Sequence, residues 1–485
     1  MEDADVVVVG SRLAGCAVAA PVARSGRKVI VIDRMTFPSD QLSTHLLTTT
    51  GVSEIAKMGA LPRVLATNPT RVSKATFICE GIPCSERLRP ADDGTDFGIC
   101  VPRDLQDICL VEAAREQGAD IRESCTFEDL LWENGRVAGI RYKDESGKRR
   151  EVRATLTVGA DGRRSNVAAR AGAWTPYRMS KNGRGLVFRY MDDPKPGTKD
   201  ADTFIVWRED RSMAFAFPSA PAGKLLVLFM GHRDEVSAAR KDPEGYWQSK
   251  LDQHSGMKER VSGVDTESLT KVRSTGDCPA FFRASSGPGW ALAGDAGHFK
   301  DPVTGQGMRD AMWMGRTLAE GVIADLDDPA GVDKATRQWE ASRDRHCLPA
   351  YHTANLDTRI ETQSAVMREI FRDAGRNEES DLSDIFTRHR TQQEIVGPRR
   401  MVRALTLALA RGEQPRGETI SRSIRDLRTE VAIRREIRDD VFRQTRTIKG
   451  SDHPGVEWPA PPKAPGAAPG AKEGRPEADS MEVSS

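Results

Sequence analysis

The first 34 residues combine two continuous apolar runs with one stretch of helical character. The run ADVVVVG ends at Gly10, the small apolar residues of AGCAVAAPVARSG follow, and a second run, KVIVID, ends at Asp33. Continuous apolar runs of this length are typical of strands that are buried on both faces of a parallel sheet. The pattern therefore predicts a strand–helix–strand unit, the building block of doubly wound α/β domains.

The chain up to residue 173 extends this unit. The segment RDLQDICLVEAAREQGA, which begins at Arg103, has apolar residues at helical spacing, and ENG separates two alternating runs in DIRESCTFEDLLWENGRVAGIRYKD. These patterns predict a helix, a hairpin and then a further strand, REVRATLTVGADG. We expect residues 1–173 to form the first part of an α/β domain, with a segment near 62–100 on its substrate side.

Short β-like runs dominate residues 174–285. RGLVFRYM, ADTFIVWRED, SMAFAFPSA and KLLVLFMGHRD are separated by Pro, Gly and Asp, which predicts a separate antiparallel sheet. The predicted strand GWALAGDAG and helix GMRDAMWMGRTLAEGVIADL then have the same strand-and-helix pattern as the first domain. We therefore expect a discontinuous α/β domain whose second part covers residues 286–332.

The remaining sequence divides into a helical region and a tail. Residues 333–450 have helical apolar spacing with interleaved acidic and basic residues, which predicts solvated helices. From Ser451 the composition changes to Pro, Ala, Gly and Glu, which bury too little apolar area to fold alone. Residues 451–485 are therefore predicted to be a disordered tail. For 356–450 three roles stay open: solvated helical packing alone, a cover over the site, or a contact with another subunit.

Composition excludes several classes of partner. The 72 basic and 71 acidic residues nearly balance, so the charge requires neither nucleic acid nor an anionic membrane. No apolar run is long enough to span a bilayer and no leader precedes the first strand, so we expect a cytoplasmic protein without a membrane span. The eight cysteines and eight histidines show no metal-ligand spacing, and no metal is expected. The oligomeric state stays open.

The turn GSRLAG resembles a dinucleotide-binding fingerprint. Gly10 and Gly15 allow a tight turn and close packing of helix on strand, whereas Arg12 replaces the glycine that lets the backbone approach a pyrophosphate. The guanidinium of Arg12 can pair with a phosphate instead. The turn alone also fits plain strand–turn–helix packing. Asp33, at the end of the second strand, favours nucleotide binding because an acidic residue there accepts hydrogen bonds from ribose hydroxyls.

Two later motifs complete a recognisable set. They are GADGRRSNVAARAG at 159–172 and WALAGDAGHFKDPVTGQGMRDA at 290–311. With the first turn they resemble the ordered motifs of the para-hydroxybenzoate hydroxylase-like superfamily of flavoproteins. FPSDQLSTH and KDP are similar to its geranylgeranyl-reductase-like branch. The resemblance implies an α/β fold: a doubly wound Rossmann-type FAD domain (1–173 and 286–332), an inserted antiparallel β-sheet substrate domain and C-terminal helices.

The resemblance also implies roles for individual residues. Asp295 accepts from a ribityl hydroxyl, Arg103 and the backbone of Phe127 contact FAD, and the loop 35–47 passes near the flavin. The predicted cofactor-binding residues are Gly10, Arg12, Leu13, Ala14, Gly15, Asp33, Arg34, Ser43, Arg103, Phe127, Asp161, Asp295, Gly305 and Gly307. The candidate catalytic residues are His45, His298, Lys300 and Pro302, and covalent attachment of FAD through His45 stays open.

These implications predict an FAD-dependent monooxygenase of secondary metabolism. It would hydroxylate an aromatic or polyketide-like small molecule with molecular oxygen, through a flavin C4a-hydroperoxide. No second GxGxxG is present, so NAD(P)H would bind transiently as co-substrate, or a separate flavin reductase would supply electrons. The alternatives are a reductase or dehydrogenase acting on a C=C bond, a flavin-binding regulatory protein without turnover, and a halogenase, which FAFP at 215–218 disfavours because it lacks tryptophan.

Overall fold

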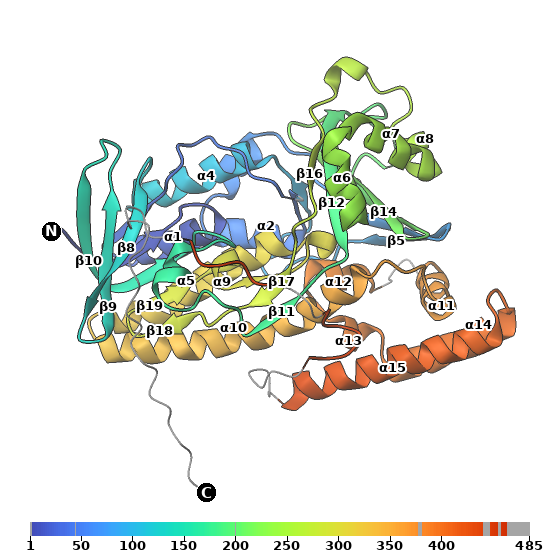
Figure 1. The fold of residues 1–485 in the computed structure, drawn as a ribbon. Helices are drawn as coiled ribbons and strands as arrows, with labels where there is room; N and C mark the ends of the chain where they lie inside the picture. The colour runs from blue at the N-terminus through green and yellow to red at the C-terminus, as the bar shows by residue number, and fades with distance from the viewer. Residues whose placement is uncertain are drawn as a thin grey trace, which may run out of the picture.

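The computed structural model describes six stretches of the chain, which form two sheet regions and a group of C-terminal helices (Figure 1). The described residues are 2–43, 45–198, 200–376, 381–439, 447–453 and 457–462. The α/β fold class predicted from the sequence is confirmed, including the doubly wound sheet and the inserted second sheet.

The first sheet has a parallel core. Its order is β19 (Trp290–Leu292), β10 (Arg149–Gly159), β1 (Glu2–Val9), β2 (Val29–Ile32) and β7 (Asp120–Arg122), all parallel, with β18 (Ser286–Gly287) antiparallel at the edge. The apolar runs at the N-terminus become the central pair because both faces of β1 and β2 are buried. The strand from the 290 region joins them, so the domain is discontinuous in sequence.

Different layers cover the two faces of this sheet. Val6 and Val8 point toward α1 (Leu13–Arg24), α4 (Arg103–Glu116) and α9 (Gly307–Val322), whereas Val7 and Val9 pack with residues of β8 (Thr126–Glu133) and β9 (Arg136–Lys143). The strands β8 and β9 continue antiparallel from β10, and α5 (Asn166–Arg170) packs beside them. Successive side chains of β1 point to opposite faces of the sheet, so one face packs on helices and the other on the strands β8 and β9.

The second sheet combines two segments of the chain. Its order is β16 (Arg273–Thr275), β12 (Arg184–Asp192), β15 (Lys224–His232), β14 (Ser212–Ser219), β13 (Thr203–Glu209), β4 (Lys74–Cys79) and β5 (Ile82–Arg87). The pairs are antiparallel except β4 with β13, which run parallel. This one parallel pair departs from the predicted antiparallel sheet, because β4 comes from the 62–100 segment and enters the sheet in the direction of β13.

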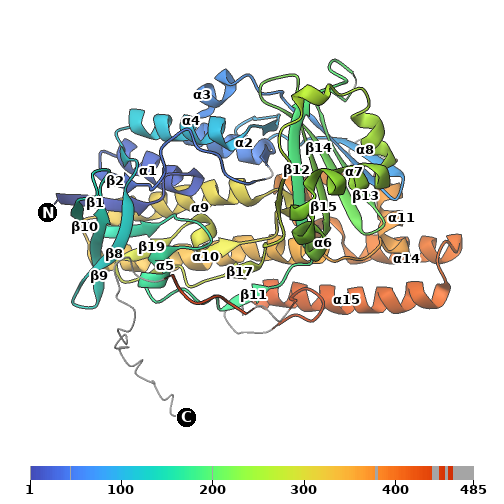
Figure 2. The same ribbon diagram turned by 45° about the horizontal axis from the view of Figure 1, so that its top comes forward.

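The inner face of the second sheet lies against the first domain (Figure 2). Phe188 and Leu228 on this face pack in one cluster with Leu46 and with Val303, which lies just before α9. The outer face is covered by α6 (Arg233–Ala238), α7 (Pro243–Gln253) and α8 (Ser255–Arg260), with Trp247 against Phe229 at 4.9 Å between ring centroids. The inner face is therefore positioned to close a site built on the first domain.

Smaller elements connect the two sheets. β11 (Arg178–Ser180), β17 (Ala280–Phe282) and β20 (His298–Phe299) form a three-stranded sheet, and β3 (Leu46–Leu47) pairs with β6 (Ile99–Cys100). The helices α2 (Thr49–Lys57) and α3 (Leu61–Ala66) lie beside α9 and α4 respectively.

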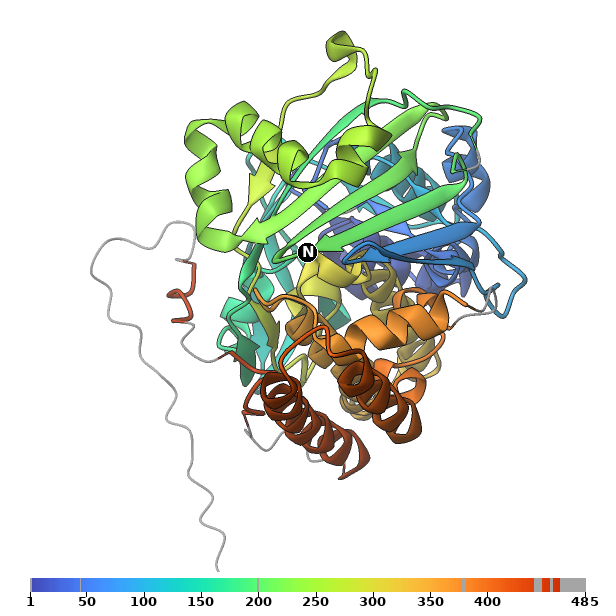
Figure 3. The same cartoon turned by 90° about the vertical axis from the view of Figure 1, so that its right-hand side faces the viewer.

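The C-terminal region is helical, as predicted. It contains α10 (Pro329–Asp357), α11 (Ala365–Ala374), α12 (Ser383–Thr387), α13 (Gln392–Ile395), α14 (Pro398–Arg411) and α15 (Arg416–Asp439). The last two helices lie on the outside of the molecule, opposite the second sheet (Figure 3). Among the helices of the described stretches, none is both long and apolar enough to cross a bilayer.

Part of the predicted tail packs on the rest of the protein, against β11, α10, Trp174 and Arg283. Asp452 pairs with Arg178 at 2.9 Å and accepts from the Tyr351 hydroxyl at 2.7 Å. The indole N–H of Trp174 donates to the Pro459 carbonyl at 2.6 Å, and Trp458 packs over the guanidinium of Arg283. Residues 451–453 and 457–462 therefore differ from the disorder that their composition predicts, because Asp452 and Trp458 anchor them. Residues 463–485 lie outside the described stretches.

Candidate functional site

The turn between β1 and α1 requires glycine at two positions. Gly10 has a φ of +100°, and a Cβ there would lie 2.5 Å from the Ala160 carbonyl oxygen. A Cβ at Gly15 would lie 1.8 Å from the Gly10 carbonyl oxygen. Neither position tolerates a side chain without movement of the backbone, so α1 starts directly against the end of β1.

The first turn of α1 presents unpaired N–H groups. Arg12 occupies the N-cap without a capping side-chain hydrogen bond, and the Cys16 N–H donates to the Arg12 carbonyl at 2.9 Å. The N–H groups of Leu13, Ala14 and Gly15 therefore have no acceptor within the helix. A helix N-terminus of this kind binds anions such as a pyrophosphate.

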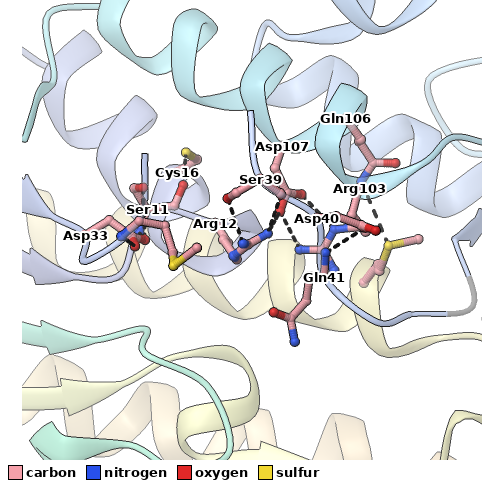
Figure 4. A network of polar contacts seen from close by, with 12 residues as sticks. Ser11, Arg12, Cys16, Asp33, Ser39, Asp40, Gln41, Arg103, Gln106 and Asp107 are labelled. Carbon is pink, nitrogen blue, oxygen red and sulfur yellow. Dashed lines mark hydrogen bonds and ion pairs between the residues drawn. The ribbon is translucent and has the colours of Figure 1, made fainter. Parts of the chain in front are cut away.

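Two arginines share one buried carboxylate beside this turn (Figure 4). Arg12 contacts Asp107 at 2.5 Å and Ser39 Oγ at 2.9 Å, and Arg103 binds Asp107 through two hydrogen bonds of 2.7 and 2.9 Å. The sequence predicted Arg12 as a direct phosphate partner, but in the structure its guanidinium is held by Asp107 and Ser39. Two cations on one carboxylate leave one positive charge in excess, which attracts an anion at the N-terminus of α1.

Asp33 and Ser11 join the same turn. One oxygen of Asp33 accepts from the Ser11 N–H at 2.7 Å and from its hydroxyl at 3.1 Å, and the other accepts from the Met35 N–H at 2.9 Å. A carboxylate oxygen accepts more than one hydrogen bond, so the side chain can both hold the turn and receive a hydroxyl. Arg34, next along the chain, is exposed.

The Asp161 motif and Phe127 have structural contacts. Asp161 accepts from the N–H groups of Asn166 and Val167 at 2.7 and 3.2 Å, and burial raises the pKa of its carboxyl group. It thus fixes the start of α5 close to Gly10. The ring of Phe127 is buried in the core between β8 and β2, so only its backbone is available to a ligand.

A second glycine-containing turn, at 294–307, holds an acidic side chain beside open backbone. Within the described residues no hydrogen bond reaches the carboxylate of Asp295, whose pKa is raised by burial and lowered less strongly by Arg163 and Arg103. A Cβ at Gly305 or Gly307 would meet no atom within 4 Å. The turn therefore combines a free acceptor with space for a flat group beside the N-terminus of α9.

These features fit FAD. A flavin adenine dinucleotide needs an anion site for its pyrophosphate, acceptors for ribose and ribityl hydroxyls, and open backbone for its ring. The N-terminus of α1, the Asp33 and Asp295 carboxylates and the Gly305–Gly307 backbone supply these groups in one α/β domain. No group of residues suited to a metal ion occurs in the described stretches.

His45 connects the loop 35–47 to the second sheet. It is 1% exposed and has a φ of +60°. Its Nδ1 accepts from the Tyr190 hydroxyl and its Nε2–H donates to the Gln41 carbonyl at 3.3 Å, while Ser43 Oγ accepts from the His45 backbone N–H at 3.3 Å. Burial lowers the His45 pKa to about 4 and raises that of Tyr190. Both side chains are therefore neutral near pH 7.

The other candidate catalytic residues have protein partners. His298 is buried, its Nδ1 contacts the Phe281 carbonyl at 2.9 Å, and its ring stacks on Phe282. Lys300 forms a buried ion pair with Asp310. Pro302 starts the short turn before α9, which Asp301 caps by accepting from the Val303 N–H at 2.9 Å.

Sequence reasoning missed Ser11, Asp107 and Tyr190. Arg103 and Asp107 are four residues apart at a helix start, a spacing that predicts a pair on one helix face and could have identified Asp107. Nothing local indicates Tyr190, because 145 residues separate it from His45.

Comparison with known proteins shows that the chain is an FAD-dependent oxidoreductase. Residues 3–342 match the family described as FAD binding domain, and the chain belongs to that family. The predicted resemblance to flavoproteins of this kind is thereby confirmed.

Individual relatives differ in their reactions. The chain is 28% identical to a digeranylgeranylglycerophospholipid reductase of Methanocella arvoryzae, over 70% of this chain and 82% of the relative. It is 26% identical to a rifampicin monooxygenase of Streptomyces venezuelae, over 66% of this chain and 64% of that enzyme. Its fold is similar to a myxobacterial chondrochloren halogenase, with a TM-score of 0.64 at 20% identity over 84% of this chain and 97% of the other.

Proposed function

We propose that the protein is a monooxygenase that hydroxylates an aromatic or polyketide-like small molecule, with molecular oxygen as oxidant and NAD(P)H as transient reductant. FAD, when bound, supplies electron transfer and oxygen activation. The observation that supports the proposal is the neutral His45–Tyr190 pair at the junction of the two sheets.

The chemistry of this pair separates two reactions. Saturation of a C=C bond needs a proton donor close to the reacting carbon, whereas transfer of oxygen to an electron-rich ring needs mainly orientation and exclusion of water. His45 has a pKa of about 4 and is therefore unprotonated near pH 7, and the Tyr190 hydroxyl already donates to His45 Nδ1, so neither side chain has a proton free for a substrate carbon. The apolar inner face of the second sheet, with Phe188 and Leu228, excludes water.

In this proposal the cofactor lies across the first domain. The N–H groups of α1 and the excess charge of Arg12 and Arg103 bind the pyrophosphate. Asp33 binds the ribose and Asp295 the ribityl chain. Gly305, Gly307, Ser43 and the backbone of Phe127 complete the contacts.

A C=C reductase is the second candidate, because the reductase from Methanocella arvoryzae shares 28% identity over 82% of its length. The two reactions differ in their need for oxygen. Purified protein with FAD and NAD(P)H is supplied with a panel of aromatic and polyketide substrates under ¹⁸O₂. We expect one labelled oxygen in the product. Saturated product formed at the same rate without oxygen contradicts the proposal.

Tyr190→Phe is the matched variant, since it keeps the ring and removes only the hydroxyl. Hydroxylation should stay within about tenfold of the wild type, because the tyrosine does not donate a proton. A reductase that uses Tyr190 as its acid would instead lose about 10²- to 10⁴-fold.

A further inference from the structure

The outward face of α15 is unusually apolar. Within the described stretches, the exposed large hydrophobic side chains concentrate on the last two helices. They are Val402 on α14 (66% exposed) and Ile420, Ile424, Leu427 and Val431 on α15 (45, 46, 54 and 44%). In the rest of the described chain, the exposed large hydrophobic side chains are those of Met35 and Trp132.

The four residues of α15 form one stripe. Their spacing of four, three and four residues puts them on a single helix face. We name Ile420, Ile424, Leu427 and Val431 the α15 stripe. The opposite side of the helix, which includes Thr429 and Ile433, is buried against the protein.

Arginines border the α15 stripe. At about 100° per residue, Arg428 and Arg435 lie beside it on the exposed surface. Asp426 pairs with Arg359, and Glu436 pairs with Arg178 on the buried side. The acidic residues nearer the α15 stripe have arginine partners on the same helix: Glu430 pairs with Arg434 and Asp439 with Arg438. The exposed face is thus aliphatic along its centre and basic along one border.

We propose that this face lies on an anionic lipid surface. A helix with an aliphatic face and arginines at its border inserts shallowly at the level of the headgroups, and the arginines contact lipid phosphates. The net charge of the whole chain is only +1, so the attraction comes from the local arrangement. The inference is independent of the reaction proposed above, because α15 lies beyond the family match at 3–342.

Charge and shape disfavour other partners. Two copies of α15 packed antiparallel along their stripes would bring the Arg428 and Arg435 rows of both copies close together, and like charges repel. A single convex helix face forms no groove that would select a protein partner by shape. A lipid surface is fluid and deforms around a convex helix, so it needs no groove of matching shape.

The test is sedimentation of the full-length protein with vesicles. We expect binding to vesicles of phosphatidylcholine and phosphatidylglycerol, weaker binding as salt rises, and little binding to phosphatidylcholine alone. The double variant Ile424→Ser/Leu427→Ser should bind anionic vesicles at least about tenfold more weakly, and Arg428→Gln/Arg435→Gln should show a similar loss.

Trp132→Ser is the matched control. It also removes an exposed large hydrophobic side chain (48% exposed), but on β8, far along the chain from α15. It should bind like the wild type, and circular dichroism should show that all variants are folded. The proposal is overturned if the wild type does not bind anionic vesicles or if the stripe variant binds equally well. It is also overturned if the stripe variant only converts a dimer into a monomer in sedimentation without lipid.

Discussion

Lys300 and Asp310 form an ion pair in which both side chains are only 2% exposed. Arg309 approaches the same carboxylate at 3.0 Å and Arg388 at 3.4 Å. Together these cations hold the pKa of Asp310 well below its usual range, although burial opposes them. One carboxylate thus compensates three buried positive charges at the first turn of α9.

Asp310→Asn should strongly destabilise the protein. It keeps the shape of the side chain but leaves three buried cations without a carboxylate, and the loss of one member of a buried ionic group costs about 3–5 kcal/mol. Urea unfolding followed by circular dichroism, with FAD in excess, measures the change. Glu320→Gln, on the same helix but 51% exposed, should change the free energy of unfolding by less than about 1 kcal/mol. Equal losses of unfolding free energy for Asp310→Asn and Glu320→Gln would refute the role of Asp310 in compensating the buried cations.

Gly10→Val should abolish FAD binding. The added Cβ would lie 2.5 Å from the Ala160 carbonyl oxygen, at a φ of +100°. The ratio of flavin absorbance to protein absorbance after purification measures occupancy. Gly26→Val is the control, since Gly26 also has a left-handed φ of +82° but open space around it, and it should retain FAD. Arg12→Gly should weaken FAD binding only moderately, because it removes the excess positive charge but leaves the free N–H groups of the first turn of α1 to bind the pyrophosphate.

Asp295→Ala should release FAD. The carboxylate is the free acceptor of the turn before α9, and its removal deletes a hydrogen bond to the ribityl chain. Titration of the apoprotein with FAD should show affinity lower by about tenfold or more, the expected value of a hydrogen bond to a charged group. Asp277→Ala, at a side chain 62% exposed, should bind FAD like the wild type. Unchanged affinity of Asp295→Ala would rule out the proposed contact.

His346 should make stability depend on acid pH. Burial, and then the nearby Arg388 and Arg309, lower its pKa to about 3, compared with about 6.5 in the unfolded chain. As pH falls from 6.5 toward 3, only the unfolded chain binds this proton, so the free energy of unfolding decreases. At about 1.4 kcal/mol for each pKa unit, the contribution between pH 7 and pH 4 is about 3 kcal/mol.

The matched pair of variants is His346→Gln and His232→Gln. Glutamine at 346 can still accept from the Arg309 guanidinium, whose Nη1 lies 2.8 Å from His346 Nε2, but it binds no proton. Its stability should therefore fall less between pH 7 and pH 4 than that of the wild type. His232 is 42% exposed, and His232→Gln, measured at the same pH values, is the control for replacing a histidine by glutamine on the surface. If the free energy of unfolding changes equally with pH in His346→Gln and the wild type, His346 is not the source of the pH dependence.

Local patterns were sufficient for the elements of the proposed cofactor site. The apolar runs around Gly10 and Asp33 predicted β1, α1 and β2, because burial on both faces of a parallel sheet needs continuous apolar sequence. The turn at 294–307 was recognisable for a similar reason: close approach of the backbone restricts residue type at a few fixed positions. Both features depend on residues that are neighbours in sequence.

Long-range contacts could not be predicted in this way. β4 enters the second sheet parallel to β13, and residues 80–202 separate the two strands in sequence. The Tyr190 hydroxyl that contacts His45 and the Asp107 carboxylate that holds Arg12 are also distant in sequence. From the sequence, Arg12 was expected to be a free cation; its contact with Asp107, seen only in the structure, shows that Asp107 partly neutralises its charge. Such pairings depend on topology rather than on local spacing.

The position of residues 451–453 and 457–462 has a consequence for how the protein forms. Asp452 and Trp458 pack against Arg178 and Arg283, which belong to strands and loops made much earlier. A growing chain folds from its N-terminus as it leaves the ribosome. These parts of the protein therefore gain their last contacts only when almost the whole chain has emerged, and a C-terminal truncation before residue 451 would interrupt assembly at its final step.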